Sequence, residues 1–303
     1  MASASLRVGS VCLALLVVGC AMPPYFPESE FWQPLSPNAE IDPDSDAYIA
    51  DLLRARHGGR LSIALDHYNV PIVRPDGATV PVDVALVSPW GHQTLTNVPI
   101  PAGAMPAAGS DAHLVVLDEA QGASYEFWRA RRTDGRWEAS AGVRFDTRGD
   151  GVNRAGTGVR ASSLSLLLGL ITYDEVRRGG PIEHALAWAF DTPNSRFFTP
   201  PAASSDGKHQ GRPGSIPEGA RLRLDPTLDV TTLGLSPVGV RLARALQRYG
   251  MFCVDASSDS TLFAEDVRGS GRSWAGLLSW DELHNIPVSR LQVLRIRTKI
   301  PIP

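Results

Sequence analysis

Short strand-like segments separated by turn-forming residues fill the first half of the chain, and this pattern constrains the fold most. The segments are rich in apolar, β-branched or aromatic residues and cover 61–65, 68–73, 80–87, 114–117, 124–131 and 136–145. Turn formers such as Pro75-Asp76-Gly77 and Asp134-Gly135 separate them. Short strands at this spacing are typical of an antiparallel sandwich or barrel.

The clearest hairpin is predicted over 124–146, with its turn at Asp134-Gly135. Side chains alternate between the two faces of a strand. In the first arm, Glu126 and Trp128 therefore share one face, opposite Tyr125 and Phe127. The second arm is predicted to be half buried, with its polar face open to solvent or a ligand.

The second half of the chain is more helical. The spacing of apolar residues predicts helices over 46–57, 173–178, 182–188 and 236–249, a helical turn over 280–283, and strands over 221–224, 251–255 and 291–296. A long loop rich in proline and glycine covers 191–219, and a loop of that length is usually functional or disordered. No internal repeat is present. The prediction is one mainly β domain over 47–303, an antiparallel β-sandwich (jelly-roll-like) with helical insertions.

The N-terminus has the features of an export signal. Arg7 precedes an apolar run that is too short to span a bilayer, which takes about 20 residues. The run ends in Val17-Val18-Gly19-Cys20, which resembles the bacterial lipobox. That resemblance implies that residues 1–19 are a lipoprotein signal peptide, and that Cys20 receives lipid and becomes the mature N-terminus. An ordinary secretory signal and an uncleaved anchor helix remain the alternatives.

Residues 20–46 hold several prolines and acids, and we expect a tether that holds the body off the membrane. The expected location is the cell envelope. Because Ala21 rather than Asp follows the cysteine, the outer membrane is the expected address in a Gram-negative cell. The expected partner is the membrane itself, through lipid on Cys20.

Charge and cysteine content narrow the possible functions. Loss of Arg7 with the signal leaves the mature chain slightly acidic, because the whole chain has 29 Lys and Arg against 32 Asp and Glu. Nucleic acid is not an expected partner, since its binding favours a basic patch. Cys12 leaves with the signal and Cys20 is lipidated, so Cys253 has no partner for a disulfide and is expected to be a small core residue.

Several stretches of the second half resemble a family of secreted bacterial proteins. They include 158–172 (GVRASSLSLLLGLIT), 182–186, 217–224 and 245–251, and the similarity covers roughly 110–295. This chain departs from the family pattern at Ala256-Ser257-Ser258, where Asn-Gly-Ser is common. The resemblance implies one folded secreted module and supplies no active site.

No strong catalytic motif is present: the chain has no Walker loop, paired CxxC, HExxH or GxSxG elbow, and no cofactor is expected. The first candidate cluster joins carboxylates and an indole. Its members are Asp111, His113, Asp118, Glu126 and Trp128. Carboxylates can act as acid and base on a glycosidic bond, and an indole can stack on a sugar ring. The alternative is that Trp128 is a core residue and Glu126 a solvated one.

The second candidate cluster comprises His184, Asp206, His209 and Asp255. His184 can equally be a structural histidine. A metal held by Asp111, His113, His184, Asp206 and His209 is a weaker alternative, because their spacing matches no known loop. Arg129, Arg131 and Arg132 could grip an acidic polysaccharide or simply protect a hairpin edge.

These observations lead to one leading expectation and two alternatives, and they leave open whether the protein is an enzyme. The leading expectation is a lipid-anchored envelope protein that binds or cleaves a polysaccharide. In it Asp111, Asp118 and Glu126 are the catalytic candidates, and Trp128, His113, His184 and Asp206 contribute to binding. The alternatives are a non-enzymatic binding module and a metal-assisted hydrolase.

Overall fold

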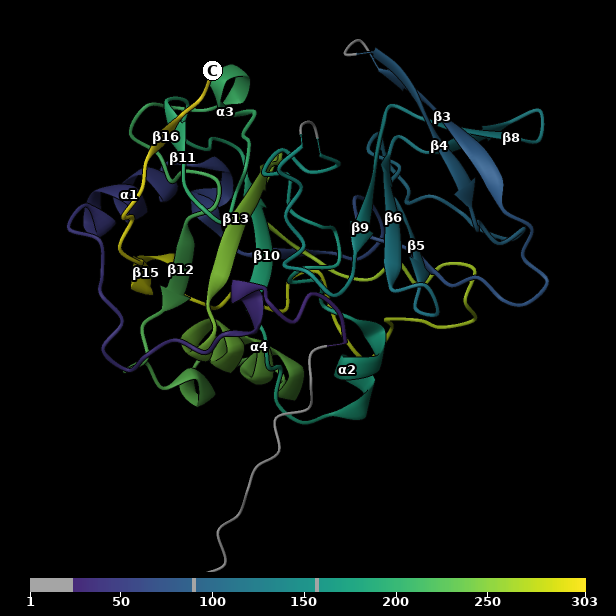
Figure 1. The fold of residues 1–303 in the computed structure, drawn as a ribbon. Helices are drawn as coiled ribbons and strands as arrows, with labels where there is room; N and C mark the ends of the chain where they lie inside the picture. Colours follow the sequence, from purple (N-terminus) through teal and green to yellow (C-terminus); the bar gives the residue numbers. More distant parts are fainter. Residues whose placement is uncertain (1–23, 89–90, 156–157) are drawn as a thin grey trace, which may run out of the picture.

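The computed structural model describes residues 24–88, 91–155 and 158–303, and over these residues the fold is mainly β (Figure 1). The largest sheet has six strands in the order β1-β14-β10-β13-β12-β15. These strands are β1 (Ser62–Ala64), β10 (Leu186–Phe190), β12 (Arg221–Leu224), β13 (Met251–Ala256), β14 (Thr261–Phe263) and β15 (Leu291–Val293). The predicted lipobox, 17–20, lies outside the described residues.

Both faces of the six-stranded sheet are buried. Leu186, Trp188 and Phe190 of β10 pack in a core that also contains side chains of α1 (Ser45–Leu52) and α4 (Pro237–Arg248). Ala187 and Ala189 point to a second core on the opposite face. Because every residue of β10 is buried, this strand shows no alternation of polar and apolar residues.

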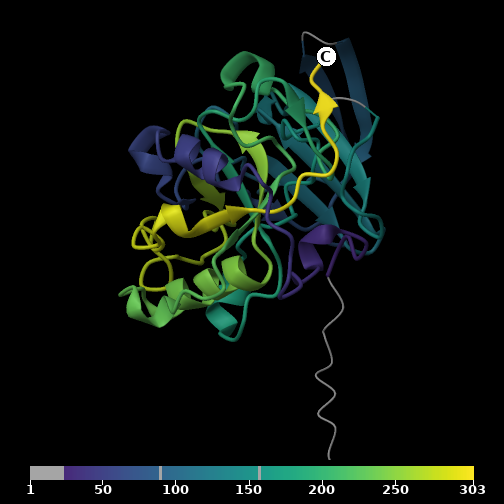
Figure 2. The same ribbon diagram turned by 90° about the vertical axis from the view of Figure 1, so that its left-hand side faces the viewer.

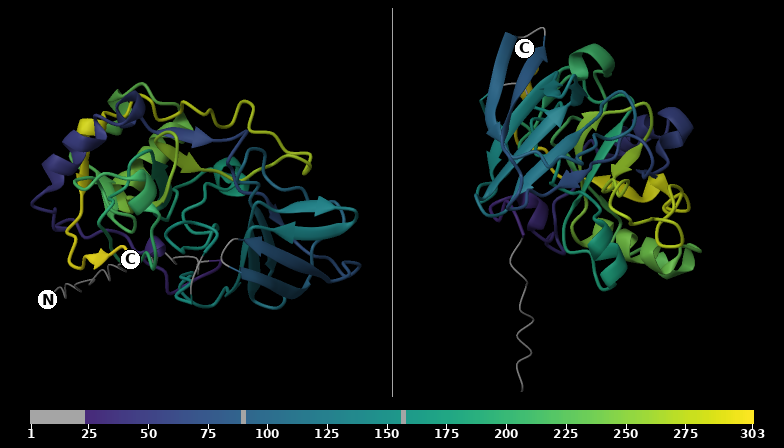
Figure 3. Two further views of the ribbon diagram at one scale, coloured as in Figure 1. Left: turned by 90° about the horizontal axis from the view of Figure 1, so that it is seen from above. Right: turned by 90° about the vertical axis from the view of Figure 1, so that its right-hand side faces the viewer.

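Two four-stranded sheets lie beside the six-stranded sheet. The middle sheet has the order β2-β5-β6-β9, and the distal sheet has the order β4-β3-β8-β7. Their strands are β2 (Ile72–Val73), β3 (Val82–Ser88), β4 (Gly91–Val98), β5 (Leu114–Asp118), β6 (Ala123–Trp128), β7 (Arg131–Thr133), β8 (Arg136–Ala139) and β9 (Ala141–Asp146). Figure 3 shows these sheets on one side of the six-stranded sheet.

The middle sheet contributes to two cores. Val115 and Leu117 of β5 pack in the core that faces the six-stranded sheet. Leu114 and Val116 pack with residues of β3 and β8 in a third core, between the middle and distal sheets. Both faces of β5 are therefore apolar, as expected for a strand between two layers.

The remaining elements are short. A two-stranded sheet pairs β11 (Phe197–Phe198) with β16 (Ile300–Pro301). The other helices are α2 (Tyr173–Arg178) and α3 (Gly207–Gln210), with 3-10 turns η1 (Glu30–Trp32), η2 (Arg56–Gly59), η3 (Val230–Thr232) and η4 (Val288–Arg290). No helix among the described residues is long and apolar enough to cross a membrane.

The predicted hairpin over 124–146 is divided between two sheets. Its outer parts, β6 and β9, pair in the middle sheet, whereas β7 and β8 pair in the distal sheet. The bend falls at Arg129, which has a positive φ of 54°, and opposite it at Ser140, whose N–H donates to the Trp128 carbonyl at 2.9 Å. One continuous hairpin therefore joins the two layers.

The predicted tether is fixed to the body at several buried residues, although about half of its described residues are exposed. Phe26 and Phe31 are fully buried, and the Phe31 ring stacks on Phe252 with centroids 4.4 Å apart. The Phe31 carbonyl accepts a hydrogen bond from the Ala185 amide at 2.7 Å, next to β10. Phe26, six positions after Cys20, is therefore already part of the folded body.

Helix predictions succeeded where capping signals were strong. The predicted range 173–178 coincides with α2, which has a capping box between Thr172 and Glu175. In α4, the Ser236 hydroxyl accepts from the Gly239 amide at 3.2 Å and Pro237 occupies the first turn. The predicted helix over 182–188 is wrong, because this segment leads into the central strand β10. Residues 280–283, which were predicted to form a helical turn, form a turn outside any helix.

The sheets are mixed rather than antiparallel. Strand β10 runs parallel to β13, β2 runs parallel to β5, and β3 runs parallel to β8. Strand β4 was not predicted. A mainly β fold is therefore shown, with parallel pairs that local patterns did not indicate.

Candidate functional site

Three carboxyl groups meet at the carboxyl ends of the parallel strands β10 and β13. They belong to Asp206, Glu218 and Asp255, and one oxygen from each lies within 4.8 Å of the others. Glu218 is fully buried, whereas Asp206 and Asp255 are half-buried. Helix α3, which follows Asp206, lies at the same end of the molecule in Figure 1. We call these residues the acidic triad.

Asp255 is positioned by an irregularity in the sheet. Trp188 pairs with Cys253, but Ala189 pairs with Asp255, so Val254 is the extra residue of a β-bulge. A bulge changes the direction of the following side chain. The amide of Ala161 donates a hydrogen bond to the Asp255 carboxylate. The one acid of the apolar segment 251–255 is thereby directed out of the sheet.

Glu218 is fixed by a tight approach of two chain segments. Its carbonyl accepts from the Thr199 amide at 2.9 Å, and the next residue, Gly219, donates to the Cys253 carbonyl at 2.7 Å. Gly219 has a φ of +86°, and a Cβ added there would lie 1.7 Å from the Thr199 carbonyl oxygen. Only glycine fits such a position. The side chain of Glu218 is therefore held beside β13.

Asp206 arrives from the long loop of the second half. This loop is fixed to the body before the triad, since the Ala203 amide donates to the Ser162 carbonyl at 3.0 Å and the Ser204 hydroxyl donates to the Ala161 carbonyl at 2.5 Å. The same segment, 161–162, thus contacts the loop and Asp255. The long loop is ordered here by backbone contacts, and it delivers one acid to the triad.

Burial makes the triad reluctant to carry its full negative charge. Burial, and then the charge of Asp206, raise the pKa of Asp255 to about 8 even though Arg160 opposes the shift. Burial and the charges of Asp255 and Asp206 raise the pKa of Glu218 well above its ordinary value. Burial also raises the pKa of Asp206. Near neutral pH the triad therefore holds protons or requires a cation.

The surroundings of Glu218 support this conclusion. Neither of its carboxylate oxygens has a hydrogen-bond donor by geometry among the described residues. The contact with the Asp206 carboxyl raises the pKa of Glu218 and needs a shared proton, whereas the Ser205 hydroxyl opposes this shift only weakly. A buried carboxylate without donors is costly unless it is protonated or bound to a cation.

A buried arginine lies next to the triad. Arg160 is 2% exposed and donates to the carbonyls of Ser165 and Leu168 at 2.9 and 3.2 Å. Its guanidinium stabilises charge on Asp255, but burial lowers the pKa of Arg160 to about 10. His113 is buried nearby, and burial lowers its pKa to about 4 despite the charge of Asp111.

The structure brings some predicted residues together and separates others. Asp111 acts electrostatically on both Asp255 and His113, so these predicted residues border the triad, and Asp206 belongs to it. His209 is exposed on α3. His184 lies elsewhere: its ring bonds the Glu175 carboxylate at 3.0 Å and the Ala185 carbonyl at 2.9 Å. The five-residue metal site is therefore not assembled.

The three predicted catalytic carboxylates do not face a common groove. Asp118 caps the turn between β5 and β6 by accepting from the Gln121 amide at 3.1 Å. Asp111 lies at the opposite end of this strand pair, where it accepts from the Trp128 indole at 3.2 Å. Glu126 is fully buried between them. The structure therefore does not bring these three carboxylates together, whereas it does bring together the acidic triad.

Trp128 offers less stacking surface than predicted. The guanidinium of Arg129 covers its ring at 4.1 Å from the centroid. Arg131 forms an ion pair with Glu138 at 2.6 Å on the exposed strand β7, and Arg132 is exposed beside it. These three arginines thus line an edge of the distal sheet, and one of them occupies the face of the predicted platform.

Glu126 has a structural role. Its oxygens accept from the Ser124 and Ser165 hydroxyls and, at 2.7 Å, from the Leu166 amide. Burial raises its pKa to about 7. These contacts join the middle sheet to the segment that precedes β10.

We expect Glu126→Gln to be tolerated and Glu126→Ala to lower the unfolding free energy by about 2–3 kcal/mol. In glutamine the amide oxygen can still accept from the Leu166 amide, and its NH₂ can donate to the two hydroxyls. Alanine leaves these donors buried without acceptors. Urea denaturation of both variants measures the difference, and equal stabilities would contradict the structural role.

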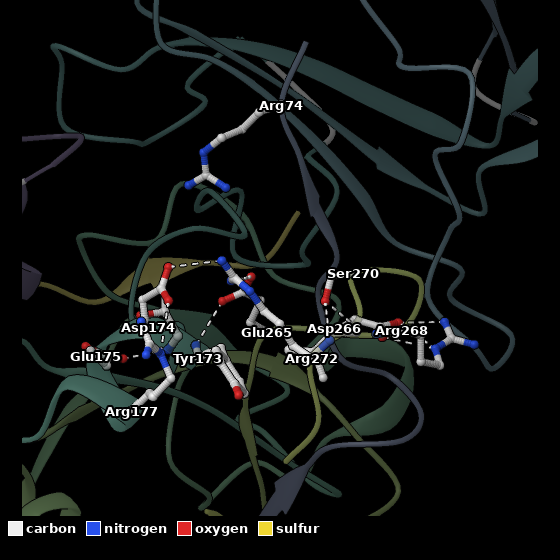
Figure 4. A network of polar contacts seen from close by, with 12 residues as sticks. Arg74, Tyr173, Asp174, Glu175, Arg177, Glu265, Asp266, Arg268, Ser270 and Arg272 are labelled. Atoms are coloured by element: carbon white, nitrogen blue, oxygen red, sulfur yellow. Dashed lines mark hydrogen bonds and ion pairs between the residues drawn. The ribbon is translucent and has the colours of Figure 1, made fainter. Parts of the chain in front are cut away.

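A separate polar network connects α2 with the segment after β14 (Figure 4). Arg272 contacts the carboxylates of Asp174 and Glu265 at 3.4 and 3.6 Å, and Glu265 accepts from the Tyr173 amide at 2.9 Å. Figure 4 shows Arg74 pointing toward this group. Its opposite charges are paired, which indicates a structural clamp rather than a reaction centre.

Glu218 is the functional candidate that sequence reasoning missed. It stands between Pro217 and Gly219, just before the buried strand β12. An acid flanked by turn formers at the entry to an apolar strand was the available signal.

No protein-family model, curated protein or solved structure matches this chain.

Proposed function

We propose that this protein is a lipid-anchored component of the bacterial cell envelope that binds or cleaves a polysaccharide, with the acidic triad as its reaction centre. One observation carries the proposal: Asp255 is half-buried, and its pKa is raised to about 8. A carboxyl group that stays protonated near neutral pH can donate a proton to a leaving oxygen.

The triad supplies the second carboxylate that glycoside hydrolysis requires. Two carboxyl groups about 5–5.5 Å apart act as acid and nucleophile in retaining enzymes. The nearest oxygens of the triad lie within 4.8 Å of one another, which leaves less room for a water molecule than the wider separation of inverting enzymes. Asp255 is the proposed acid, and Asp206, the other half-buried member, is the proposed partner that reaches the sugar.

The location rests on Cys20 and the lipobox pattern before it. An anchored body at the cell surface or in the periplasm meets polysaccharides directly. A cavity of about 460 Å³ lies beside the loop that carries Asp206 and is lined in part by Pro200, Pro201, Asp150 and Arg154. The triad carboxylates are not among its lining residues. We therefore assign the cavity to binding of the polysaccharide next to the reaction centre. We also propose that the middle and distal sheets form the sandwich, since they share one core.

The test begins with a glycan array and continues with turnover of any bound polysaccharide. We expect Asp255→Asn to reduce kcat at least about 100-fold, because it removes the acid. Glu218→Gln should also reduce it, by altering the proton distribution. Glu183→Gln is the matched control, since Glu183 is exposed and outside the triad.

The outcomes separate the proposed functions. Binding without turnover in the wild-type protein would favour the non-enzymatic module. Turnover that survives in Asp255→Asn would contradict the assignment of the acid. Mass spectrometry of the native protein tests the anchor separately, and an unmodified Cys20 would contradict the location.

A metal-assisted hydrolase is the second candidate, and one observation favours it. Three carboxylate oxygens within 4.8 Å of one another can surround Ca²⁺, which binds oxygen ligands at about 2.3–2.6 Å. The burial of Glu218, with the Ser205 hydroxyl as its one favourable donor among the described residues, agrees with a cation there. In that case the ion rather than a proton neutralises the triad.

A further inference from the structure

The described chain begins on the side of the molecule that carries α2 and α4. Pro24 is exposed at this start, and Phe26 is already fully buried with its amide bonded to the Thr147 carbonyl at 2.5 Å. Figures 1 and 2 place the beginning of the described chain near these helices, away from α3. An extended residue spans at most about 3.6 Å, so the four positions from Cys20 to Pro24 cover about 14 Å. A lipid on Cys20 therefore keeps this side close to the bilayer.

The outward face of α4 is basic. Arg241, Arg244 and Arg248 recur at intervals of three and four residues and so form one stripe along the helix. The opposite face, which includes Leu242 and Leu246, is buried in the core. Arg244 and Arg248 are exposed, and Arg241 is half-buried.

The stripe borders a depression of about 680 Å³. Besides the three arginines, its lining consists of Gly180, Pro181, Ile182, Pro226, Ala245 and Gln247, and no carboxylate is among these described residues. The Arg241 guanidinium donates to the carbonyls of Gly180, Val176 (3.0 Å) and Glu175 (2.8 Å). Arg241 thus holds the end of α2 in place as one wall of the depression. Arg244 and Arg248 are available to bind a ligand.

Neighbouring charges leave the stripe available. Asp229 lies within electrostatic reach of Arg244, but it accepts hydrogen bonds from the Thr231 amide and hydroxyl. Glu183 is exposed near the end of α2, where Arg177 and Arg178 are also exposed. Asp174 and Glu175 lie in the first turn of α2, and Glu282 accepts a hydrogen bond from Ser236 at the start of α4, so the excess of positive charge is confined to the stripe itself.

We propose that the stripe Arg241–Arg244–Arg248 binds the phosphate groups of anionic phospholipids in the membrane that holds the anchor. This inference rests on the location in the proposed function, and it adds an orientation. Guanidinium groups form paired hydrogen bonds with phosphate oxygens, and each basic residue near an anionic surface strengthens binding. The acidic triad lies at the opposite end of β13 from α4, so it faces away from the bilayer.

The experiment measures vesicle binding of the full chain carrying Cys20→Ser, which cannot be acylated. Vesicles of phosphatidylcholine with about one third phosphatidylglycerol are compared with vesicles of phosphatidylcholine alone. We expect tighter binding to the anionic vesicles and a decrease with salt. Adding Arg244→Ala and Arg248→Ala should weaken binding to the anionic vesicles about 30-fold. The control adds Arg132→Ala and Arg136→Ala, two exposed arginines of the distal sheet, and should bind like the parent.

Two results would overturn the proposal: equal weakening in both double variants, or binding that does not depend on anionic lipid. Binding to soluble alginate in place of anionic vesicles would overturn it too, and would identify an acidic polymer as the ligand. These assays need neither acylation nor an intact triad. Their failure is therefore distinguishable from a failure of the reaction centre, which the turnover variants report, and of the anchor, which mass spectrometry reports.

Discussion

Replacing Phe31 by alanine is expected to lower the melting temperature by about 10 °C. Phe31 is fully buried against Phe252, and removing a buried phenyl ring costs about 3–5 kcal/mol. For a chain of this size, each kcal/mol shifts the melting temperature by about 2–4 °C. Thermal unfolding followed by circular dichroism measures the change.

Pro37→Ala is the matched control for this prediction. Pro37 lies in the same N-terminal segment but is exposed, so its loss should shift the melting temperature by no more than a degree or two. If Phe31→Ala also melted within two degrees of the wild type, residues 25–46 would be a free tether after all.

The stability of the acidic triad should depend on pH in a defined direction. The folded protein holds the Asp255 proton up to a pKa of about 8, whereas the unfolded chain releases it near its ordinary value. Between these values the folded state binds more protons, so the contribution of Asp255 to stability falls as pH rises. Asp255→Asn removes this loss.

We therefore expect the melting temperature of Asp255→Asn, relative to the wild type, to be about 10 °C higher at pH 8.5 than at pH 5. Comparing variant with wild type at each pH cancels the other groups with raised pKa values, such as Glu126 and His184. A variant that was less stable than the wild type at pH 8.5 would show that Asp255 is ionised and well paired.

Calcium distinguishes the two ways of neutralising the triad. A cation that binds only the folded protein at 100 times its Kd adds about 2.7 kcal/mol of stability. If the triad binds Ca²⁺, the wild type at pH 8.5 should gain melting temperature with added calcium and Asp255→Asn should not. An equal response of both proteins would leave the shared proton as the explanation.

Local patterns predicted those elements whose ends are marked by the chain itself. The capped helix α2 and the strand β12 were predicted at their observed bounds, and α4 within a residue or two. The segment 182–188 failed for a physical reason. A strand buried on both faces has no alternation, and its apolar residues follow Pro181, which also opens helices.

The candidate site was less predictable because its members meet only through tertiary structure. Asp206, Glu218 and Asp255 come from a loop, a turn and a bulged strand, and β10 and β13 must pair before these acids approach. The alternation of side chains placed Glu126 and Trp128 on one face of β6. It could not show that the segment 165–166 covers Glu126 on this face. Glu126, which was predicted to be catalytic, is fully buried.

The bent hairpin has a mechanical consequence. The distal sheet continues into the middle sheet through two strands and shares a core with it, so tilting it as a rigid plate would open that core. Its tip at Asp134-Gly135 is the part least restrained by either layer. Length added at that tip changes what the molecule presents to its surroundings without disturbing the arrangement of the three layers.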